Sequence, residues 1–311
     1  MKIINFREQF IKSKIAICAI ILNYLGYSDT IDCVNTLIQQ KISRIVILEN
    51  SGSAVEKRKL NEAFGHISHV DVTPSRTNLG FSGGVNYVLR QMLPLQFDAF
   101  LIVNNDILAP PNLIENLIKA VYTESLDLAA PLIYHYPEKH LLWSQGNFYN
   151  PIFGIERNSP IFCLPRNVFY LTGCCLFVRK KVFDTVGLFD ESFFIYGEDV
   201  EFCYRANKNG FRIGVVKDAQ IYHRVNASSQ NNSLFYEYYI NRGHFILSKK
   251  LSHSKSEYMA FFPMKLLIMG IRALVRTIRY RNLNALRGYF MAALHPMYRR
   301  LKILCNTTAW S

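Results

Sequence analysis

Two adjacent acidic residues, Glu198 and Asp199, follow a glycine in the stretch FFIYGEDVEFCYRANKNG at 193–210. Carboxylates are common at the start of a helix, because the free N–H groups and the helix dipole favour negative charge there. A carboxylate in a cleft can instead act as a general base. The pair therefore has two interpretations, helix capping or proton transfer, and the other motifs must decide between them.

A glycine-rich segment, NLGFSGGVN at 78–86, lies between an expected strand and an expected helix. Glycines let backbone N–H groups approach a phosphate, and the start of a helix attracts it. The segment is neither a Walker loop, since no Gly-Lys-Ser/Thr follows, nor GxGxxG. A phosphate site and a simple tight turn both remain open.

Two further residues could bind a divalent cation. Asp106 ends the run IVNND at 102–106, where a carboxylate could hold a cation that bridges phosphate oxygens. His223 ends the run AQIYH at 219–223, and an imidazole there could complete a metal site. A solvated turn at Asp106 and a structural role for His223 are the alternatives.

The elements that must position these residues alternate between strand and helix. Strands are predicted at 15–23, 44–50, 66–72 and 97–106, and helices at 28–40, 53–64, 83–93 and 111–124. This alternation predicts an α/β fold with a mostly parallel, doubly wound sheet, whose ligands lie beyond the carboxyl ends of the strands. The segments LENSG, NLGFSGG and VNND fall at those ends.

The middle of the chain is irregular and rich in aromatic residues, with strands expected near 126–134 and 168–178. A helix is expected from Gly197 to Gly210, because glycine is favoured just beyond a helix end. Two short strands, FRIGVV and AQIYH, are expected after it.

The order and spacing of these motifs resemble the family 2 glycosyltransferases with the GT-A fold, and most closely the bacterial rhamnosyltransferase-like branch that builds surface polysaccharides such as O-antigen. The resemblance runs from Ile15 to Ser229. ILENSGS resembles the family's Val-Asp-Asn-x-Ser segment, NLGFSGGVN its glycine-rich segment, and NND stands at the usual place of Asp-x-Asp. The most specific stretch is LTGCCLFVRKKVFDTVGLFDESFFIYGEDVEFCYRANKNGFRI, which contains the family's Gly-Glu-Asp.

The resemblance implies a GT-A-type, Rossmann-like sheet flanked by helices and an inverting hexosyl transfer from a nucleotide-sugar. Asp199 would be the base that deprotonates the acceptor hydroxyl, with Glu198 beside it, and Asp106 and His223 would hold Mg²⁺ or Mn²⁺. The donor would be bound by Asn23, Glu49, Asn78, Gly80, Phe81, Gly83, Gly84, Asn86, Asn104, Asn105 and Gly173.

Two positions depart from the family pattern. Asn104 stands where Asp-x-Asp has its first aspartate, so a bound cation would lose a charged ligand and bind weakly. Glu49 stands where an aspartate usually recognises the nucleoside, and its longer side chain would shift that pocket.

Positive charge is concentrated at the end of the chain. The net charge is +13, and residues 242–311 hold 13 of the 36 Lys and Arg residues but only one of the 23 acids. From Leu234 onward the spacing is helical, with one apolar face formed by Leu267, Ile271, Leu274, Val275 and Ile278 and a basic cluster at Arg299, Arg300 and Lys302. A basic amphipathic helix favours an anionic membrane surface. Packing of the apolar stripe on the catalytic part is the alternative.

We therefore expect a catalytic domain at 1–232, with a nucleotide-sugar half at 15–125 and an acceptor half at 126–232, and a basic amphipathic helical region at 233–311. The seven cysteines are scattered without CxxC spacing, which favours a reducing cytoplasm over a zinc or disulfide framework. The segment 15–28 is too short to span a bilayer.

The leading hypothesis is a cytoplasmic glycosyltransferase, peripheral on the inner face of the membrane, that extends a lipid-linked glycan, with rhamnose the favoured sugar. A uridine-diphosphate hexose or galactofuranose is the nearest rival donor. A nucleotidyltransferase acting on sugar phosphates is disfavoured because NLGFSGGVN lacks a basic residue that would grip a triphosphate. A non-catalytic, membrane-associated scaffold is the third possibility, motivated by Asn104. No nucleic-acid-binding motif is recognised, so nucleic acid is not an expected partner.

Overall fold

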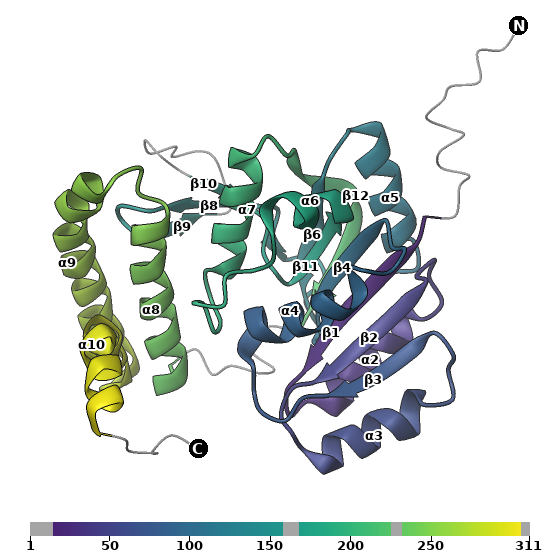
Figure 1. Cartoon of the computed structure of the whole chain (residues 1–311), viewed down its shortest axis with the longest axis horizontal. Helices are drawn as coiled ribbons and strands as arrows, with labels where there is room; N and C mark the ends of the chain where they lie inside the picture. Colours follow the sequence, from purple (N-terminus) through teal and green to yellow (C-terminus); the bar gives the residue numbers. More distant parts are fainter. Residues whose placement is uncertain (1–14, 158–167, 225–231, 306–311) are drawn as a thin grey trace, which may run out of the picture.

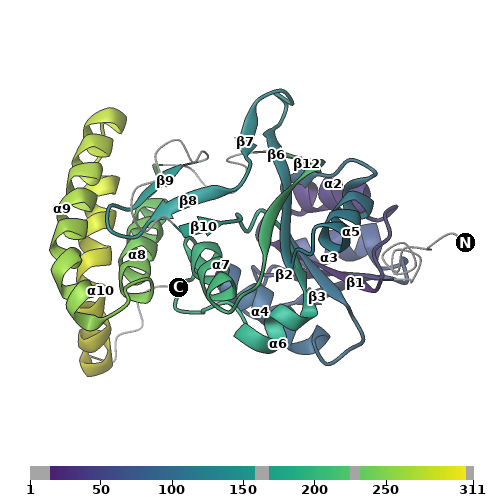
Figure 2. The ribbon, with the colours of Figure 1, turned by 90° about the horizontal axis from the view of Figure 1, so that it is seen from above.

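A computed structural model describes residues 15–157, 168–224 and 232–305 of the chain. Its centre is a sheet of nine strands with helices on both faces, and three long helices stand together at one side of it (Figures 1 and 2). The predicted α/β class, with a mostly parallel sheet flanked by helices and a helical C-terminal region, is confirmed.

The first half of the described chain has the predicted alternation. Its parallel strands are β1 (Ile17–Asn23), β2 (Arg44–Glu49), β3 (Val70–Pro74) and β4 (Ala99–Asn104). The helices are α2 (Tyr27–Leu37), α3 (Ala54–Phe64), α4 (Gly80–Met92) and α5 (Leu113–Thr123). Asn23 pairs with Glu49 and Leu22 with Asn104, so the carboxyl ends of β1, β2 and β4 form one edge of the sheet.

The second half completes the sheet and adds a smaller one. The strands β5 (Ile107–Leu108), β6 (Leu128–His135), β7 (Leu142–Ser144), β11 (Cys175–Arg179) and β12 (Ile213–His223) join in the order β3-β2-β1-β4-β11-β6-β12-β5, with β7 paired to β6. β11 is antiparallel to both β4 and β6. The strands β8 (Asn147–Asn150), β9 (Ile155–Arg157) and β10 (Val168–Tyr170) form the smaller sheet.

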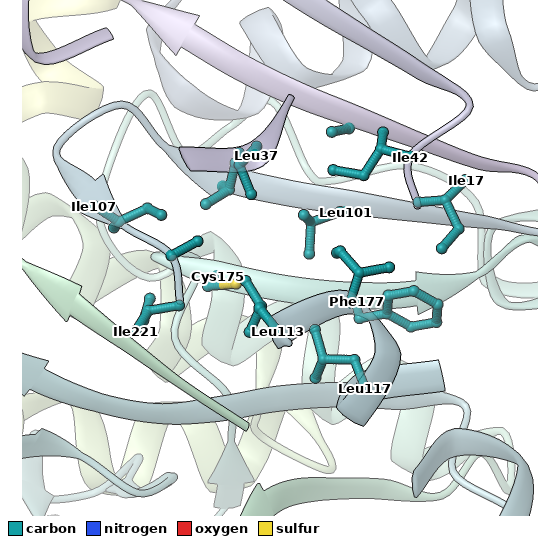
Figure 3. Close-up of a cluster of buried hydrophobic side chains, with 14 of the residues drawn as sticks. Ile17, Leu37, Ile42, Leu101, Ile107, Leu113, Leu117, Cys175, Phe177 and Ile221 are labelled. Atoms are coloured by element: carbon teal, nitrogen blue, oxygen red, sulfur yellow. The ribbon is translucent and has the colours of Figure 1, made fainter. Parts of the chain in front are cut away.

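Two clusters of buried apolar side chains fill the two faces of the main sheet. One lies against α2, α3 and α5 and includes Leu37, Leu101 and Phe177 (Figure 3). The other lies against α4, α6 (Lys180–Val186) and α7 (Glu198–Lys208). Phe100 and Leu101 are neighbours on β4 but belong to opposite clusters, because strand side chains alternate. Burial on both faces explains the continuous apolar runs of these strands.

Three helices complete the described chain: α8 (Leu234–Lys250), α9 (Lys255–Tyr280) and α10 (Asn284–Cys305). Ser233 and Ser254 cap α8 and α9 by accepting hydrogen bonds from the backbone N–H groups three residues further on. α8 lies between α7 and the pair α9–α10 (Figure 1). The helical pattern predicted after Leu234 is therefore confirmed.

The structure differs from the prediction in four places. The predicted strand 168–178 is two strands, β10 and β11, which belong to different sheets. The two short strands expected after α7 are one strand, β12, with an irregularity between Val216 and Gln220. Helix α6 was not predicted, because its seven residues are too few to show a helical period. Finally, α4 begins at Gly80 instead of residue 83, because the Asn78 side chain accepts a hydrogen bond from the Gly80 N–H and supports the first turn.

Candidate active site

The acidic pair opens α7, directly after a turn in which Tyr196 and Gly197 both have positive φ, 70° and 99°. Asp199 Oδ2 accepts a hydrogen bond from the Gly173 N–H at 3.1 Å, and Oδ1 accepts one from the Val200 N–H at 2.8 Å. These two bonds fix the plane of the carboxylate and leave each oxygen a second lone pair. Asp199 therefore belongs to the first turn of α7, and the connection between β10 and β11 orients its carboxylate.

The two acids of the pair have different surroundings. Glu198 is buried, and its Oε2 has no hydrogen-bond partner among the described residues. Burial, followed by the charge of Asp199, raises the pKa of Glu198 to about 8. Burial also raises the pKa of Asp199, but the N–H groups of Gly173 and Val200 oppose this. The two N–H groups therefore favour the ionised form of Asp199, whereas burial favours the protonated form of Glu198.

The connection from β10 to β11 lies close to Asp199 and to two other motifs, the glycine-rich segment and the end of β4. A Cβ atom at Gly173 would lie 3.1 Å from Cζ of Phe81 and 3.9 Å from Cβ of Asp199. The next residue, Cys174, accepts a hydrogen bond at 2.9 Å from the backbone N–H of Asn104. The glycine-rich helix start, the end of β4 and the base thus meet around Gly173, where a side chain would intrude.

The start of α4 is held by contacts within the chain. Gly80 has a φ of +71°, and a Cβ there would lie 2.3 Å from the carbonyl oxygen of Phe194. That same carbonyl accepts a hydrogen bond from the Phe81 N–H at 2.7 Å. The N–H groups of Gly80 and Phe81 therefore already have partners, so a phosphate at this helix start would have to use later N–H groups. Gly84 allows close packing instead, since its Cβ would lie 3.1 Å from the side chain of Leu22.

Asp106 and His223 lie together, although 117 positions separate them in the sequence. His223 Nε2 is 3.1 Å from Asp106 Oδ1, and both side chains are buried, at 7% and 5% exposure. Asp106 Oδ1 and His223 Nδ1 lack hydrogen-bond partners among the described residues. A buried carboxylate oxygen beside an imidazole fits a divalent cation. The described chain has no cluster of three or more His, Cys, Asp or Glu, so a cation here would need further ligands from a bound diphosphate.

Several other predicted donor-binding side chains bond to the protein itself. Asn23 contacts Glu56 and Thr30, Asn105 contacts Thr30, Glu49 contacts Ser51, and Asn78 contacts Asn50. Asn86 donates to the Phe189 carbonyl and the Glu191 carboxylate and accepts from the Phe189 N–H, so its amide ties α4 to the loop before α7. These residues shape the sheet edge, and the hydrogen-bonding groups of Asn86 are already occupied.

Sequence reasoning missed the support that α8 gives to the base. A Cβ at Gly243 would lie 2.4 Å from the carbonyl oxygen of Tyr196, and Leu247 packs against Gly197. Helix α8 therefore presses on the turn that begins α7. The contact spans about fifty residues of sequence, and a glycine in a helix interior is the only signal that could have pointed to it.

A polar cluster connects the smaller sheet with α9. The Nζ of Lys265 donates to the Tyr149 hydroxyl at 2.9 Å and the Pro151 carbonyl at 3.2 Å, and the Tyr149 hydroxyl lies 3.0 Å from His244 Nδ1. Burial lowers the pKa of Lys265 to about 7. Loss of hydration among the neighbouring groups, followed by the charge of Asp199, raises the pKa of Glu156 on β9 to about 7. Glu156 nevertheless keeps access to solvent. The smaller sheet is thus linked to the C-terminal helices α8 and α9.

The fold and this site together define a GT-A-like glycosyltransferase. A solved mannosyltransferase from Pyrobaculum calidifontis, in complex with GDP-Man and Mn²⁺, superposes with a TM-score of 0.54 at 12% identity, covering 97% of this chain and 94% of that one. The family model described as glycosyl transferase family group 2 matches residues 100–299, and the chain belongs to that family. The matched range includes Asp106, Asp199 and His223.

Two curated glycosyltransferases are similar to this chain in sequence. The low-salt glycan biosynthesis hexosyltransferase of Haloferax volcanii is 24% identical over 294 residues, covering 90% of this chain and 91% of the relative. The N-acetylglucosaminyl-diphospho-decaprenol L-rhamnosyltransferase of Mycobacterium tuberculosis is 29% identical over 180 residues, 50% of this chain and 59% of the relative. The predicted likeness to family 2 glycosyltransferases, with rhamnosyltransferases among the relatives, is confirmed.

Proposed function

We propose that the enzyme transfers a sugar, rhamnose in the first instance, from a nucleoside-diphosphate donor to a glycan acceptor with inversion at the anomeric carbon. The convergence of Asp199, Gly173 and Phe81 carries this proposal, because it puts an oriented carboxylate beside the glycine-rich helix start. The choice of rhamnose is supported by the mycobacterial relative's name.

In this mechanism Asp199 accepts the proton of the acceptor hydroxyl. The hydroxyl oxygen then forms a bond to the anomeric carbon as the bond between that carbon and the diphosphate oxygen breaks. Glu198 stays protonated at neutral pH and adds no second negative charge beside the base. The backbone N–H groups of Gly173 and Val200 hold the Asp199 carboxylate in place during the transfer.

Asp106 and His223 would hold Mg²⁺ or Mn²⁺ together with the donor diphosphate. When bound, the cation would neutralise the charge that develops on the departing diphosphate. Asn104 supplies no charge here, so we expect weak metal binding, with half-maximal activity at a millimolar metal concentration. Asp106→Asn should lower turnover about a hundredfold or more and raise the metal concentration needed for half-maximal activity.

The acceptor is proposed to be lipid-linked and to be used at the cytoplasmic face of the membrane. Support comes from the decaprenol-linked acceptor in the relative's name and from the excess of Lys and Arg after residue 242. We assign the transfer chemistry to residues 1–232 and the approach to the membrane to residues 233–311. Surface polysaccharide synthesis is the process that such an enzyme would serve.

A panel of nucleotide-sugars tests the proposal. Purified protein, Mn²⁺ and a lipid-linked N-acetylhexosamine acceptor should release nucleoside diphosphate from thymidine-diphosphate rhamnose and form product of inverted configuration. Release from a uridine-diphosphate hexose instead would change the sugar but keep the mechanism. Release of pyrophosphate would contradict the proposal in favour of nucleotidyl transfer, and no release with any donor would favour a scaffold.

A further inference from the structure

In the middle of helix α9, many apolar residues lie on the outside and the charged residues lie on the inside. Between residues 259 and 278 every exposed side chain is apolar. The five residues of the predicted stripe are 50% to 69% exposed: Leu267, Ile271, Leu274, Val275 and Ile278. Packing of this stripe on the catalytic part is therefore excluded. α9 is also the only helix of the described chain that is long and apolar enough to cross a membrane.

The three basic residues in the middle of α9 face the protein instead of solvent. Arg276 Nε lies 2.5 Å from Oε1 of Glu237, a fully buried acid on α8, and Arg272 Nη1 lies 3.5 Å from its Oε2. Lys265 is 1% exposed and bonds to Tyr149. The expected picture of a helix with basic residues facing an anionic surface is therefore wrong for the middle of α9. Its cations attach the helix to the rest of the enzyme.

Exposed apolar side chains also occur beyond α9, in the turn after it and on α10. Leu283, Phe290 and Leu294 are also exposed, at 53%, 57% and 43%. Exposed cations lie at both ends of the α9 stripe, at Lys255 before it and at Arg279 and Arg281 after it, and Arg287 lies between Leu283 and Phe290 on the exposed side of α10. At 1.5 Å per residue the stripe from 259 to 278 is about 30 Å long. An exposed apolar stripe of this length marks an interaction site.

We propose that the outer face of α9 and α10, which we call the apolar face, inserts into one leaflet of a lipid bilayer with α9 lying in the plane of the membrane. The charge pattern indicates that lipid covers this face. An apolar strip bordered by exposed lysine and arginine matches a hydrocarbon layer bordered by anionic headgroups. This inference rests on the proposed lipid-linked acceptor, because an enzyme seated this way meets such an acceptor at the membrane.

A membrane-spanning position for α9 is incompatible with the contacts that hold it to the protein. Lys265, Arg272 and Arg276 occupy the middle of the helix, and a spanning helix would carry them into hydrocarbon. Their partners, Tyr149 and Glu237, belong to β8 and α8. α8 in turn presses on the turn that begins α7. Spanning would break all of these contacts, whereas insertion of the apolar face leaves them intact.

Vesicle sedimentation of the full chain tests the inference. Wild-type protein should bind phosphatidylcholine vesicles, bind vesicles with added phosphatidylglycerol more tightly, and stay bound in about 1 M salt, where the Debye length is about 3 Å. Ile271→Ser/Val275→Ser/Ile278→Ser should lower binding about tenfold or more. Val55→Ser/Leu95→Ser is the matched control, since it removes exposed apolar side chains elsewhere.

Three results would overturn the inference. The first is release by salt together with loss of binding in Arg279→Gln/Arg281→Gln, which would make the contact an electrostatic tether. The second is a monomer–dimer equilibrium that the triple serine variant abolishes while vesicle binding is unchanged, which would make the face an interface between copies. The third is normal vesicle binding by a well-folded triple serine variant, judged by circular dichroism.

Tryptophan quenching distinguishes the two orientations. Met264→Trp, Ile271→Trp and Ile278→Trp should be quenched to a similar extent by lipids brominated at a shallow position, because an in-plane helix places them at one depth. Weaker quenching at residue 271 than at residues 264 and 278 with these shallow lipids, and stronger quenching at 271 with lipids brominated near the chain end, would indicate a spanning helix and overturn the proposal. Transfer to a water-soluble acceptor should be unchanged in the triple serine variant. Failure of wild-type protein in that assay would count against the proposed reaction and leave the membrane result standing.

Discussion

Helices α7 and α9 use charge in opposite ways. The first turn of α7 holds three acids, Glu198, Asp199 and Glu201, while its apolar side chains are buried in the core. In the middle of α9 the basic side chains point inward, while a stripe of apolar ones faces out. The charges of α7 lie at the candidate active site. The inward-facing charges of α9 bind that helix to the rest of the protein. The comparison teaches that composition and period alone do not say which face of a helix is inside.

The attachment of α9 depends most on Glu237. Glu237→Gln would remove the buried carboxylate that Arg272 and Arg276 contact, so we expect a loss of unfolding free energy on the order of 3 kcal/mol. Chemical denaturation measures it. Glu62→Gln makes the same change in an exposed ion pair and should cost less than about 0.5 kcal/mol. Equal effects in the two variants would refute the distinction between buried and surface charge.

The second attachment, at Lys265, predicts a pH dependence of stability. The folded pKa is about 7 and the ordinary value is 10.5, so the unfolded chain binds more protons between these values. Stability should therefore rise with pH from about 7 to 10, by a few kcal/mol, and the penalty is complete below pH 7. Lys265→Met should flatten this rise, whereas Lys255→Met, at an exposed position, should keep it. Identical pH curves for wild type and Lys265→Met would rule out this account of Lys265.

The contact between α8 and the base turn gives a smaller effect that reaches the active site. Gly243→Ala would force a Cβ to 2.4 Å from the Tyr196 carbonyl oxygen, and we expect a loss of about 1–3 kcal/mol with lowered turnover. Gly270→Ala is the control, since its nearest contact would be 3.5 Å and alanine favours a helix by up to about 1 kcal/mol. Full turnover in Gly243→Ala would show that α8 does not position the base.

The smallest effect is expected at Glu198, the protonated member of the acidic pair. Glu198→Gln imitates that protonated state, so turnover at pH 7 should stay within about threefold of wild type. Differences should appear only above pH 8, where wild-type Glu198 ionises. A pH profile of kcat/KM measures this. Loss of turnover at pH 7 would mean that Glu198, and not Asp199, accepts the proton of the acceptor hydroxyl.

The sequence predicted most of the sheet but less of the site. Strands β1, β2 and β4 were predictable because burial on both faces makes them continuously apolar. The meeting of Asp106 and His223 was expected only from family resemblance, since no local pattern relates two such distant residues. The roles of Gly243 and Lys265 could not be predicted, because helical spacing assigns residues to a face but not to a neighbour.

The proposal that Asp199 is the base depends on one comparison, of transfer rate with donor binding. Asp199→Asn should lower the transfer rate about 10²–10⁴-fold while calorimetry shows nucleoside diphosphate binding in Mn²⁺ at wild-type affinity. Asp184→Asn, at an exposed acid of α6, should match wild type in both measurements. A rate within a few-fold of wild type in a folded Asp199→Asn protein would contradict the assignment of Asp199 as the base.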